Sequence, residues 1–383
     1  MKNGPTKLVH VAAWAWTLGG IQSTLRHHRQ FDAKLGFDSR FIALFDQSVL
    51  APGDQLVRAR GGQLVGSIRR RFQRLAEPHQ DAVFIYHDGW GLRWWADGDG
   101  ASRRIVFLHT EVPQLDGLLR DFAPRVDGFV CVSQALRDRV TRVVPEFPRE
   151  RCVALPFFVE TPVLPSRPKP RADRPWIIGY AGRLERAHKR VERLPELVER
   201  LTDAGVDFEM EILGDGQLRP FLEKRLGGNV RVHLCGDRRG AAYWDTIRRW
   251  DFVTLVSDYE GFSRATMEGM KVGALPVHPE FSNAAREVLG PLGKYGLYPT
   301  GDMEACADCI RRYTRLTETQ REKLQDEAFQ HLQNHTVDHY ETAFKAAVNH
   351  LIALPGRAET PSPGWWENSL PLGAFTRLFS KRF

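Results

Sequence analysis

One stretch of the chain, residues 252–277, constrains the class of fold more than any other. It opens with an apolar, β-rich run from Phe252 to Val256, which predicts a buried strand of a parallel sheet. A polar loop follows, and then an amphipathic helix that ends near Gly273. A strand, a short loop and a helix make up half of a βαβ unit. In open sheets built from such units, ligands bind in the crevice outside the carboxyl ends of the strands.

Two carboxylates flank the predicted start of this helix, Glu260 in the loop and Glu268 in the helix, with seven residues between them. The backbone N–H groups near Arg264, Ala265 and Thr266, together with the helix dipole, suit a diphosphate. Carboxylates do not bind phosphate, so the two glutamates are better suited to accepting hydrogen bonds from hydroxyl groups. A phosphate flanked by two hydroxyl-rich groups describes a nucleotide sugar. The alternative is that Glu260 is an ordinary loop acid and Glu268 a solvated helix residue, without a shared role.

The segment EGFSRATMEGMKVGALPV, residues 260–277, resembles the Glu-x7-Glu signature of retaining GT-B glycosyltransferases of the large family 4 group. Members usually read EGFG, then EAMA a few residues on, then GxPVV. Three positions depart from this pattern without removing a carboxylate: Ser263, Gly269 and Lys271. The resemblance implies an α/β fold of two Rossmann-like doubly wound domains that face each other across a cleft. It also implies donor contacts from the loop and the helix start: Gly261, Phe262, Ser263, Arg264, Ala265, Thr266 and Glu268.

A second motif, GRLERAHKR, follows an apolar run that predicts a strand over residues 176–181. Arg183 and Lys189 lie six positions apart across the loop from strand to helix, so both can reach one phosphate pair. Arginine offers a planar fork and lysine a point charge, and both suit pyrophosphate. Solvated surface residues are the alternative. Because the motif resembles the family's GRL…K segment, it implies that these two cations grip the donor diphosphate.

Two further turns in the second half are similar to family motifs. The segment DFEMEILGDG places Gly214 directly after a predicted strand, and the strand predicted at 230–234 is followed by Cys235 and Gly236. The resemblance implies that these three residues lie beside the donor, with the loop at Cys235 meeting the base. The segment 279–283 departs from a loop that is often glycine-rich in the family.

Apolar runs and amphipathic stretches alternate through the first half of the chain, which predicts a doubly wound parallel sheet. The turn Gly19-Gly20 follows the first run and opens a helix, and such a turn lets a backbone approach a phosphate closely. A plain tight turn is the alternative; the family resemblance implies contact with the donor phosphates. The predicted strands cover residues 8–16, 39–45, 81–86, 104–108, 126–133 and 152–157.

Two of these predicted strands run into a histidine, His87 and His109. Both positions lie at the rim of a parallel sheet where function concentrates. We expect His87 to be structural, as most histidines are. The segment VFLHTEVP resembles the family segment whose histidine faces the donor sugar. The resemblance therefore implies a catalytic role for His109, shared with Glu260, Arg183 and Lys189.

Two segments have a composition that suits an anionic membrane surface. From Arg58 to Arg74 the chain has six arginines and no acid, with apolar residues at helical spacing. The alternative is a surface helix whose apolar side packs into the core. The tail, residues 364–383, is aromatic and basic, and it either anchors to a membrane or packs on the first domain.

The proline-rich segment 164–175 predicts an interdomain linker. We therefore expect an N-terminal Rossmann-like, acceptor-side domain over residues 1–163 and a C-terminal Rossmann-like domain over 176–355 that binds the nucleotide sugar. Residues 356–383, which include this tail, form the segment that would cross back to the first domain. A chain of 383 residues is long enough for two such domains, each with its own core.

The composition, 42% apolar and 26% charged with a net charge of +7, is that of a soluble globular protein that favours anionic partners. Five scattered cysteines and no apolar run of about 18 residues predict a cytoplasmic protein, at most peripheral on the inner face of the membrane. No cofactor and no metal are expected, because Asp97 and Asp99 fit a plain turn and the C-x-x-C at 306–309 has no second ligand pair. Nucleic-acid binding is disfavoured because aromatic residues do not interleave with the arginines.

Together with these features, the resemblance to the family implies a metal-independent, retaining hexosyltransferase. It would move a sugar from a nucleotide diphosphate donor to a glycan or lipid-linked hydroxyl acceptor, as in the biosynthesis of cell-surface polysaccharide or lipopolysaccharide. Two alternatives share the fold: a non-catalytic nucleotide-sugar-binding or scaffold subunit, and a phosphorylase. A silent subunit has no chemical need for the full set of acids and cations: Arg183, Lys189, Glu260 and Glu268.

Overall fold

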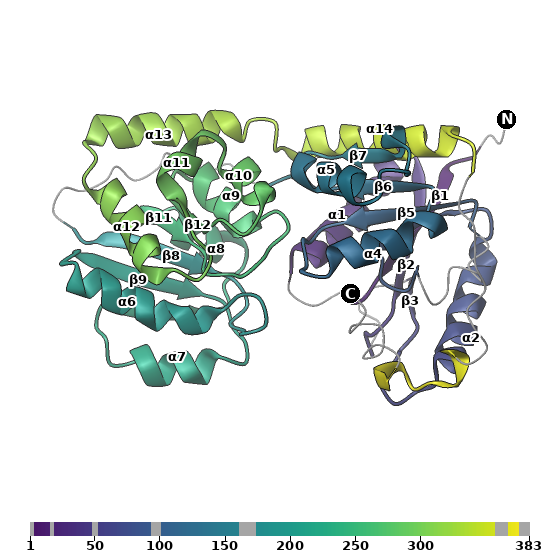
Figure 1. Ribbon diagram of the computed structural model, residues 1–383, viewed down its shortest axis with the longest axis horizontal. Coiled ribbons are helices and arrows are strands. Elements are labelled where there is room, and N and C mark those ends of the chain that lie inside the picture. Colours follow the sequence, from purple (N-terminus) through teal and green to yellow (C-terminus); the bar gives the residue numbers. More distant parts are fainter. Residues whose placement is uncertain are drawn as a thin grey trace. The chain divides into compact units, whose positions relative to one another are not determined.

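The chain forms two compact units, each built on a parallel β-sheet. The computed structural model describes residues 4–15, 19–47, 53–92, 101–160, 174–356 and 367–374 (Figure 1). The first unit combines residues 1–156 with 340–383, and the second covers residues 157–339. Each unit is a doubly wound α/β structure, so the predicted fold class is confirmed.

The sheet of the first unit has seven parallel strands among its described residues, with β1 near the middle. The chain winds outward from β1 in one direction to β3 and then, from β4, in the other direction to β7, so the order reverses between β1 and β4. In sheet order the strands are β3 (Asp54–Leu56), β2 (Phe37–Ala43), β1 (Thr6–Ala12), β4 (Val83–His87), β5 (Arg103–Leu108), β6 (Gly128–Cys131) and β7 (Cys152–Ala154).

The central strands of this sheet are covered on both faces, which is why they read as unbroken apolar runs. All five residues of β4 are buried, and so are the last five of β5. The helices of the unit are α1 (Gly20–Leu35), α2 (Val65–Ala76), α4 (Leu115–Phe122), α5 (Gln134–Val143) and α14 (Val337–Ala353).

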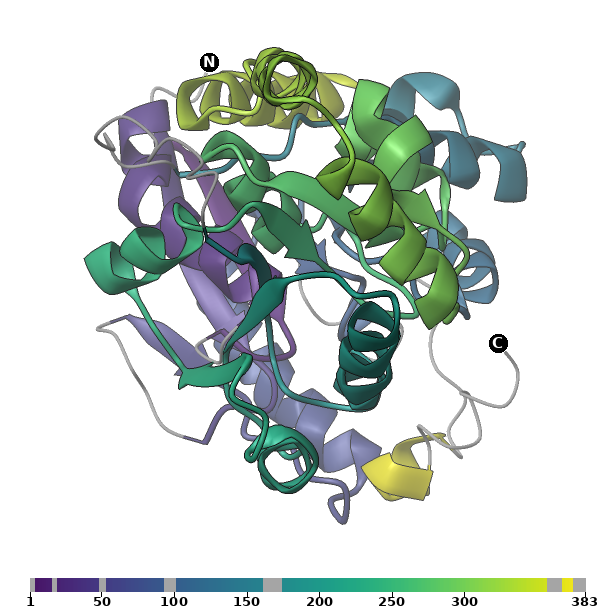
Figure 2. The same ribbon diagram turned by 90° about the vertical axis from the view of Figure 1, so that its left-hand side faces the viewer.

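The second unit repeats this winding on a six-stranded parallel sheet, with helices on both of its faces (Figure 2). In sheet order its strands are β10 (Val232–Gly236), β9 (Phe208–Leu213), β8 (Trp176–Ala181), β11 (Phe252–Thr254), β12 (Leu275–Pro279) and β13 (Leu297–Tyr298). Its helices are α6 (Leu194–Asp203), α7 (Arg219–Leu226), α8 (Gly240–Ile247), α9 (Arg264–Lys271), α10 (Asn283–Leu289), α11 (Gly293–Gly296), α12 (Met303–Thr314) and α13 (Glu318–His331).

Most predicted elements are present, with shifted ends. The strand at 176–181 and the helix at 318–331 match β8 and α13 residue for residue. The first strand is shorter than predicted, since β1 ends at Ala12. The prediction missed the short strands β3 and β13, and it missed β12, whose two prolines are unusual in a strand with neighbours on both sides.

The predicted domain boundaries differ from the observed partition, because α14 packs on the first unit. Its residues from Tyr340 onward belong to that unit, whereas the sequence pattern had assigned them to the second domain. The end of α14 is held there by two arginines: Arg103 donates to the carbonyl of Leu354 at 3.0 Å, and Arg151 donates to that of Pro355 at 2.6 Å. Most of the predicted linker lies outside the described residues.

The described part of the tail packs against the start of α2. The backbone N–H of Val65 donates to the carbonyl of Leu370, and that of Leu372 donates to Gln63. Among the two alternatives for the tail, residues 367–374 therefore follow the packed one; residues 375–383 lie outside the described part of the chain.

The basic helix predicted between Arg58 and Arg74 corresponds to α2, and its apolar side is part of the core. Ile68, Phe72 and Ala76 are fully buried. This side of the helix is therefore occupied by packing, as the surface-helix alternative expects. Contact with a membrane through the arginines alone stays a prediction.

Among the described residues, no helix is long and apolar enough to cross a membrane. The five cysteines are free thiols, and four of them are buried. Burial raises the pKa of Cys306 to about 12 and that of Cys309 to about 11, although Thr254 hydrogen-bonds the first thiol and Arg312 lies near the second. These thiols are core residues of α12.

We expect Gly179→Ala to lower the stability of the second unit. A Cβ at this position of β8 would lie 1.8 Å from the indole of Trp250, which is buried and donates to Glu211 at 2.8 Å. Overpacking of this kind costs about 1–3 kcal/mol, which corresponds to a loss of several degrees in melting temperature. The control is Gly228→Ala, because a Cβ there meets no atom within 4 Å. Equal melting temperatures for the two variants would contradict this packing.

Candidate active site

Three glycine-containing loops meet at the carboxyl edge of the second sheet. The N–H of Gly182, after β8, donates to Leu213 at 3.1 Å, and the N–H of Gly214 donates to Gly236 at 2.8 Å. Gly214 has a φ of +130°, and a Cβ on it would lie 1.9 Å from the carbonyl oxygen of Gly182. A side chain at Gly214 would separate the loops. The structure therefore places the predicted donor residues Gly214 and Gly236 side by side.

The two predicted cations lie on the loop after β8, in different environments. Arg183 is 46% exposed, and its guanidinium lies 3.2 Å from Glu185. Lys189 is only 16% exposed, and its Nζ donates to Oε1 of Glu260 at 2.7 Å. Arg183 is thus accessible to an arriving anion, whereas Lys189 is largely buried and paired with Glu260.

Glu260 is an ionised carboxylate whose side chain is only 12% exposed. Its Oε1 accepts from Lys189 and also from the hydroxyl of Ser257 at 2.7 Å. Burial alone would raise the pKa of Glu260, but Lys189, His188 and the Ser257 hydrogen bond outweigh burial and lower that pKa below its usual value. The structure thus brings together Lys189 and Glu260, two residues that are 71 positions apart in the sequence.

His278 is a site residue that the sequence analysis missed. It lies near the end of β12, is fully buried, and donates through Nδ1 to the carbonyl of Pro279 at 2.8 Å. Burial lowers the pKa of His278 to about 4, against the opposing effect of the Pro279 hydrogen bond and of Glu260. Because β12 itself was not predicted, no signal placed this histidine at the edge of the sheet.

The start of α9 is capped by the residue that replaces the family's second glycine. The Oγ of Ser263 accepts from the N–H of Thr266 at 3.4 Å and lies 2.9 Å from the Thr266 hydroxyl. The departure at Gly269 is also structural, since a Cβ there would lie 2.7 Å from the side chain of Val253 in β11. Gly269 lets α9 lie close to the sheet, so that the first turn of the helix, in which Ser263 caps the N–H of Thr266 but not those of Arg264 and Ala265, lies beside the end of β11.

Several predicted donor residues on this segment use their side chains for packing. The ring of Phe262 packs on Phe157 with 5.8 Å between centroids, and the guanidinium of Arg264 lies 5.5 Å from the ring centroid of Phe158. Ala265 packs against the apolar cluster around Trp250. Any donor contact of these residues, and of Gly261, therefore rests mainly on the backbone.

Glu268 is held by a tyrosine that the sequence analysis missed. The hydroxyl of Tyr243, on α8, donates to Oε2 of Glu268, and the Nε of Arg264 lies 3.5 Å from Oε1. Burial and the neighbouring carboxylate of Glu268 raise the pKa of Tyr243 well above its usual value. Cys235 is half-buried and packs on the same apolar cluster as Tyr243. Spacing along the chain gives no sign of the Tyr243–Glu268 contact, because it joins two separate helices.

In the first unit, Gly19 and Gly20 form the start of α1 at the carboxyl end of β1. Gly19 is the N-cap and provides no side chain, and its carbonyl accepts from the N–H of Ser23 at 3.1 Å. The N–H groups of the first turn are therefore not covered by a capping side chain. Residues 16–18 lie outside the described part of the chain, and so do Asp97 and Asp99.

His109 lies just beyond β5, fixed by its backbone and its ring. Its N–H donates to Oδ1 of Asp88 at 2.6 Å, and its Nε2 lies 2.8 Å from Nδ1 of His87. Burial, assisted by His28 and His10, lowers the pKa of His109 to about 3, so the ring is neutral. Burial raises the pKa of Asp88 to about 6, despite its hydrogen bonds from the backbone of His109 and Thr110. Asp88 has no sequence signature.

Part of the chain is similar to a known family of proteins. Residues 175–315 match the family model described as Glycosyl transferases group 1. A GDP-mannose-dependent alpha-(1-6)-phosphatidylinositol dimannoside mannosyltransferase of Mycobacterium tuberculosis is 26% identical over 196 residues, which are 49% of this chain and 46% of that protein. The chain thus spans about half the length of the curated relatives it matches.

Solved structures resemble nearly the whole chain. The lipopolysaccharide outer core galactosyltransferase WaaB, in its apo form, superposes with a TM-score of 0.67 at 17% identity, over 90% of this chain and 99% of that one. The pneumococcal O-GlcNAc transferase GtfA, in complex with UDP and GlcNAc, gives a TM-score of 0.70 at 10% identity, over 91% and 99%. These likenesses confirm the GT-B fold of two Rossmann-like domains.

We expect Lys189→Met to destabilise the protein at pH 7 by about 1–3 kcal/mol or more, because it leaves the Glu260 carboxylate, which is only 12% exposed, without its cation. In the wild type the lowered pKa of Glu260 contributes stability above about pH 4.5, and this contribution is lost as the pH falls through the lower, folded value. In the variant, burial raises the pKa of Glu260 instead. The stability gap to wild type should therefore narrow as the pH falls from 7 toward 4.5, in denaturant titrations.

The double variant Lys189→Met/Glu260→Gln is the control, since it removes both charges. It should be more stable at pH 7 than Lys189→Met alone. A gap between Lys189→Met and wild type that stays constant over this pH range would contradict the assigned pairing.

Proposed function

We propose that this protein is a retaining glycosyltransferase that moves a sugar from a nucleotide diphosphate donor to a hydroxyl of a glycan or a lipid-linked acceptor. The observation that carries the proposal is the arrangement at the edge of the second sheet. An exposed arginine, an enclosed Lys189–Glu260 pair and the N-terminus of α9 occur on neighbouring strand ends. The family match at 175–315 covers all of these residues and supports sugar transfer.

The two cations would act on the departing diphosphate. Negative charge on the leaving group grows as the bond to the sugar breaks, so a fixed positive charge stabilises the transition state more than the bound donor. Arg183 provides a forked donor at the surface, and Lys189 has two further N–H groups besides the one directed at Glu260. The N-terminus of α9 would share this role through its free N–H groups.

The acids would hold hydroxyl groups. Glu268, oriented by Tyr243, would accept from the ribose hydroxyls, and Glu260 would orient the donor sugar. The hydrogen bonds from Lys189 and Ser257 that stabilise the Glu260 carboxylate also lower its basicity. A carboxylate of low basicity is a weak nucleophile, which favours an orienting role over a covalent one. The proposed chemistry needs no metal ion or other cofactor.

The acceptor and the cellular location are inferred from the relatives and from the charge of the chain. One relative is named for transfer to a phosphatidylinositol mannoside and a structural neighbour for transfer to lipopolysaccharide, so a membrane-borne acceptor is our proposal for this chain as well. The net charge of +7 and the arginines on α2 would favour the inner, anionic face of a membrane from the cytoplasmic side.

We expect one nucleoside diphosphate out of UDP, GDP, ADP and dTDP to stabilise the purified chain. A ligand at about a hundred times its dissociation constant stabilises a protein by about 2.7 kcal/mol. Arg183→Ala should weaken this binding at least tenfold, because Arg183 is the accessible cation of the site. The control is Arg200→Ala on α6, which removes an arginine of the same 46% exposure. Thermal shift against ligand concentration measures both effects.

Binding without dependence on Arg183 would contradict the assigned phosphate contact. If none of the four diphosphates or their sugars stabilises the protein, donor binding by the free chain is wrong, and the scaffold alternative takes its place.

Retention makes a separate prediction. With the nucleotide sugar whose base the binding test selects, the product should carry the anomeric configuration of the donor. Proton NMR of the glycosylated acceptor measures this directly, since the coupling of the anomeric proton distinguishes the two configurations of a gluco- or galactopyranoside. An inverted product would overturn the retaining assignment while leaving sugar transfer intact.

A further inference from the structure

Three buried histidines of the first unit form a diagonal line across the face of the sheet. His10 pairs in register with Ile85 of β4, and His87 lies two residues beyond Ile85; likewise His87 pairs with Phe107 of β5, and His109 lies two residues beyond it. Residues two apart on a strand point to the same face. Each histidine therefore lies one step nearer the carboxyl edge than the one before it.

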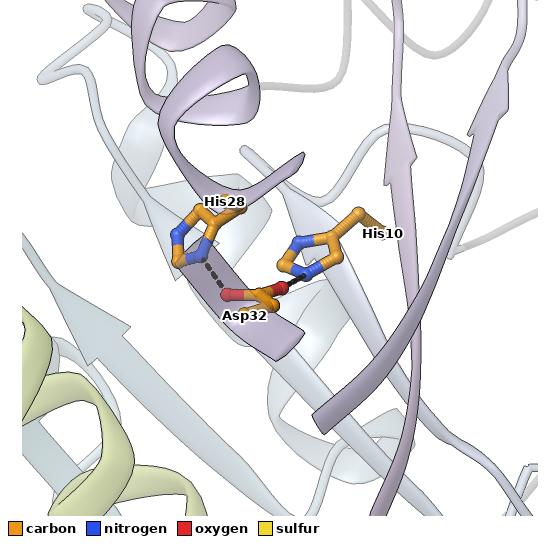
Figure 3. A group of neighbouring side chains, drawn as sticks. All are labelled: His10, His28 and Asp32. Atoms are coloured by element: carbon orange, nitrogen blue, oxygen red, sulfur yellow. Dashed lines mark hydrogen bonds and ion pairs between the residues drawn. The ribbon is translucent and has the colours of Figure 1, made fainter. Parts of the chain in front are cut away.

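The three rings are joined by hydrogen bonds into a chain that ends on a carboxylate. The Nε2 of His109 lies 2.8 Å from Nδ1 of His87, and Nε2 of His87 lies 3.0 Å from Nδ1 of His10. The Nε2 of His10 lies 3.1 Å from Oδ2 of Asp32, on α1. We call these four residues the histidine relay. Figure 3 shows the inner end of the relay, where the Asp32 carboxylate lies between the rings of His10 and His28.

Asp32 fixes the direction of every hydrogen bond in the relay. Its burial opposes ionisation, but His28 and His10 outweigh that effect and hold the pKa of Asp32 below its usual value. An ionised carboxylate only accepts hydrogen bonds, so Nε2 of His10 must carry a proton. Burial lowers the pKa of His10, so this ring is neutral and its Nδ1 is an acceptor.

The positions of the protons on the next two rings follow in the same way. Because Nδ1 of His10 accepts, Nε2 of His87 donates to it. Burial and the neighbouring His109 lower the pKa of His87 well below its usual value, so its Nδ1 accepts in turn from Nε2 of His109. His109 is also neutral, which leaves its Nδ1 without a proton. Within the described part of the chain, this buried Nδ1 has no hydrogen-bond partner.

The inner end of the relay has the residue types of a metal site, but its ligand atoms are engaged in hydrogen bonds. His10, His28 and Asp32 place three candidate ligand atoms within 4.8 Å of one another. However, each ring nitrogen directed at Asp32 is at hydrogen-bond distance from its own carboxylate oxygen, and Ser39 donates to the same carboxylate. The far nitrogen of His28 is engaged with the hydroxyl of Tyr340 at 2.8 Å. Hydrogen bonds thus account for every one of these atoms.

We propose that Asp32, His10 and His87 are positioning residues that hold His109 in the Nε2–H tautomer, so that its Nδ1 is presented at the carboxyl edge as a hydrogen-bond acceptor for a ligand hydroxyl. The inference deepens the proposed function and rests on it only for the identity of that hydroxyl, which belongs to the donor sugar or the acceptor. An acceptor nitrogen selects a hydroxyl and rejects a lone-pair group such as an ether oxygen.

The relay also gives a proton at His109 a defined destination. If Nδ1 of His109 takes a proton, Nε2 of His109 passes its own to Nδ1 of His87, and Nε2 of His87 passes its proton to Nδ1 of His10. The chain gains one proton, and the positive charge comes to rest on His10, against the Asp32 carboxylate. The other polar groups packed around this end are His28, Ser39, Tyr340 and the Arg29 guanidinium. Burial lowers the pKa of His10 and so opposes a positive charge there, as His28 and Arg29 do, whereas Asp32 favours that charge.

The experiment is a ring-nitrogen NMR spectrum of the full chain labelled with ¹⁵N-histidine, in which His109→Gln identifies the His109 signals. We expect the wild-type signals of a neutral ring with a proton on Nε2 and none on Nδ1. In Asp32→Asn, a side chain that only accepts is replaced by one that also donates, which permits the opposite tautomer along the relay. In His87→Phe the link itself is lost. Both variants should change the His109 signals.

The matched control is His27→Phe, which removes a buried histidine that neighbours the relay on α1 and is paired with Glu341 outside it. This variant should leave the His109 signals unchanged. A wild-type proton on Nδ1 of His109 would overturn the proposal, and so would unchanged signals in both folded relay variants or a stoichiometric metal ion in the purified chain. If a variant fails to fold, the wild-type spectrum decides.

Kinetics separates this inference from the proposed function. With a nucleotide sugar that the wild type uses, Asp32→Asn and His87→Phe should lower kcat by about tenfold or more, the worth of one hydrogen bond to the reacting sugar, while KM changes less. A wild type that transfers no sugar would remove the proposed function, whereas the tautomer spectrum would still test the relay.

Discussion

A polar group that is buried in the interior of a protein needs a hydrogen-bond partner within the protein, and this requirement shapes the candidate site residues of both units. In the second unit, Glu260 meets Lys189 and Glu268 meets Tyr243; in the first, Asp32 satisfies His10 and His28. Each carboxylate is kept ionised or oriented by at least one group from a different strand or helix. The same contacts that make burial tolerable therefore fix the direction in which a functional atom points, and the site is preorganised as a result of folding.

Local patterns in the sequence were sufficient for the elements and for the motifs that follow them. The run 176–181 is apolar throughout, and the spacing at 318–331 is helical from a capping threonine to a histidine, so β8 and α13 could be predicted to the residue. The GRL…K and Glu-x7-Glu motifs could be placed because each directly follows a buried strand. What could not be predicted depends on pairing between distant segments: the contacts of Tyr243 and His278, and the register that aligns His10 with His87 and His109.

The sequence left the partner of α2 open and assigned α14 to the second domain, and both outcomes have a common physical origin. An amphipathic helix shows that one of its sides is covered, but the pattern is the same whether a core or a membrane covers it. The apolar side of α2 is buried in the first unit, and α14 packs on that unit although it follows the second in sequence. In the case of α14, the helix buries one apolar side in the first unit, and Arg103 and Arg151 hydrogen-bond the carbonyls directly after its end. Neither arginine belongs to a recognisable motif, because its partner is a backbone carbonyl.

The Lys189–Glu260 pair connects the electrostatics of the second unit to its chemistry. Without a ligand, the charge of Lys189 is balanced by Glu260, so the site does not hold an uncompensated buried cation. A diphosphate brings more than one negative charge and would compete for Lys189, while the exposed Arg183 meets it without first breaking an ion pair that is enclosed. Such a donor would weaken the contact of Glu260 with Lys189 and leave that with Ser257 in place. The second carboxylate oxygen of Glu260 would then be the stronger acceptor for a sugar hydroxyl. In this arrangement, binding of the phosphate and orientation of the sugar are coupled through a single lysine.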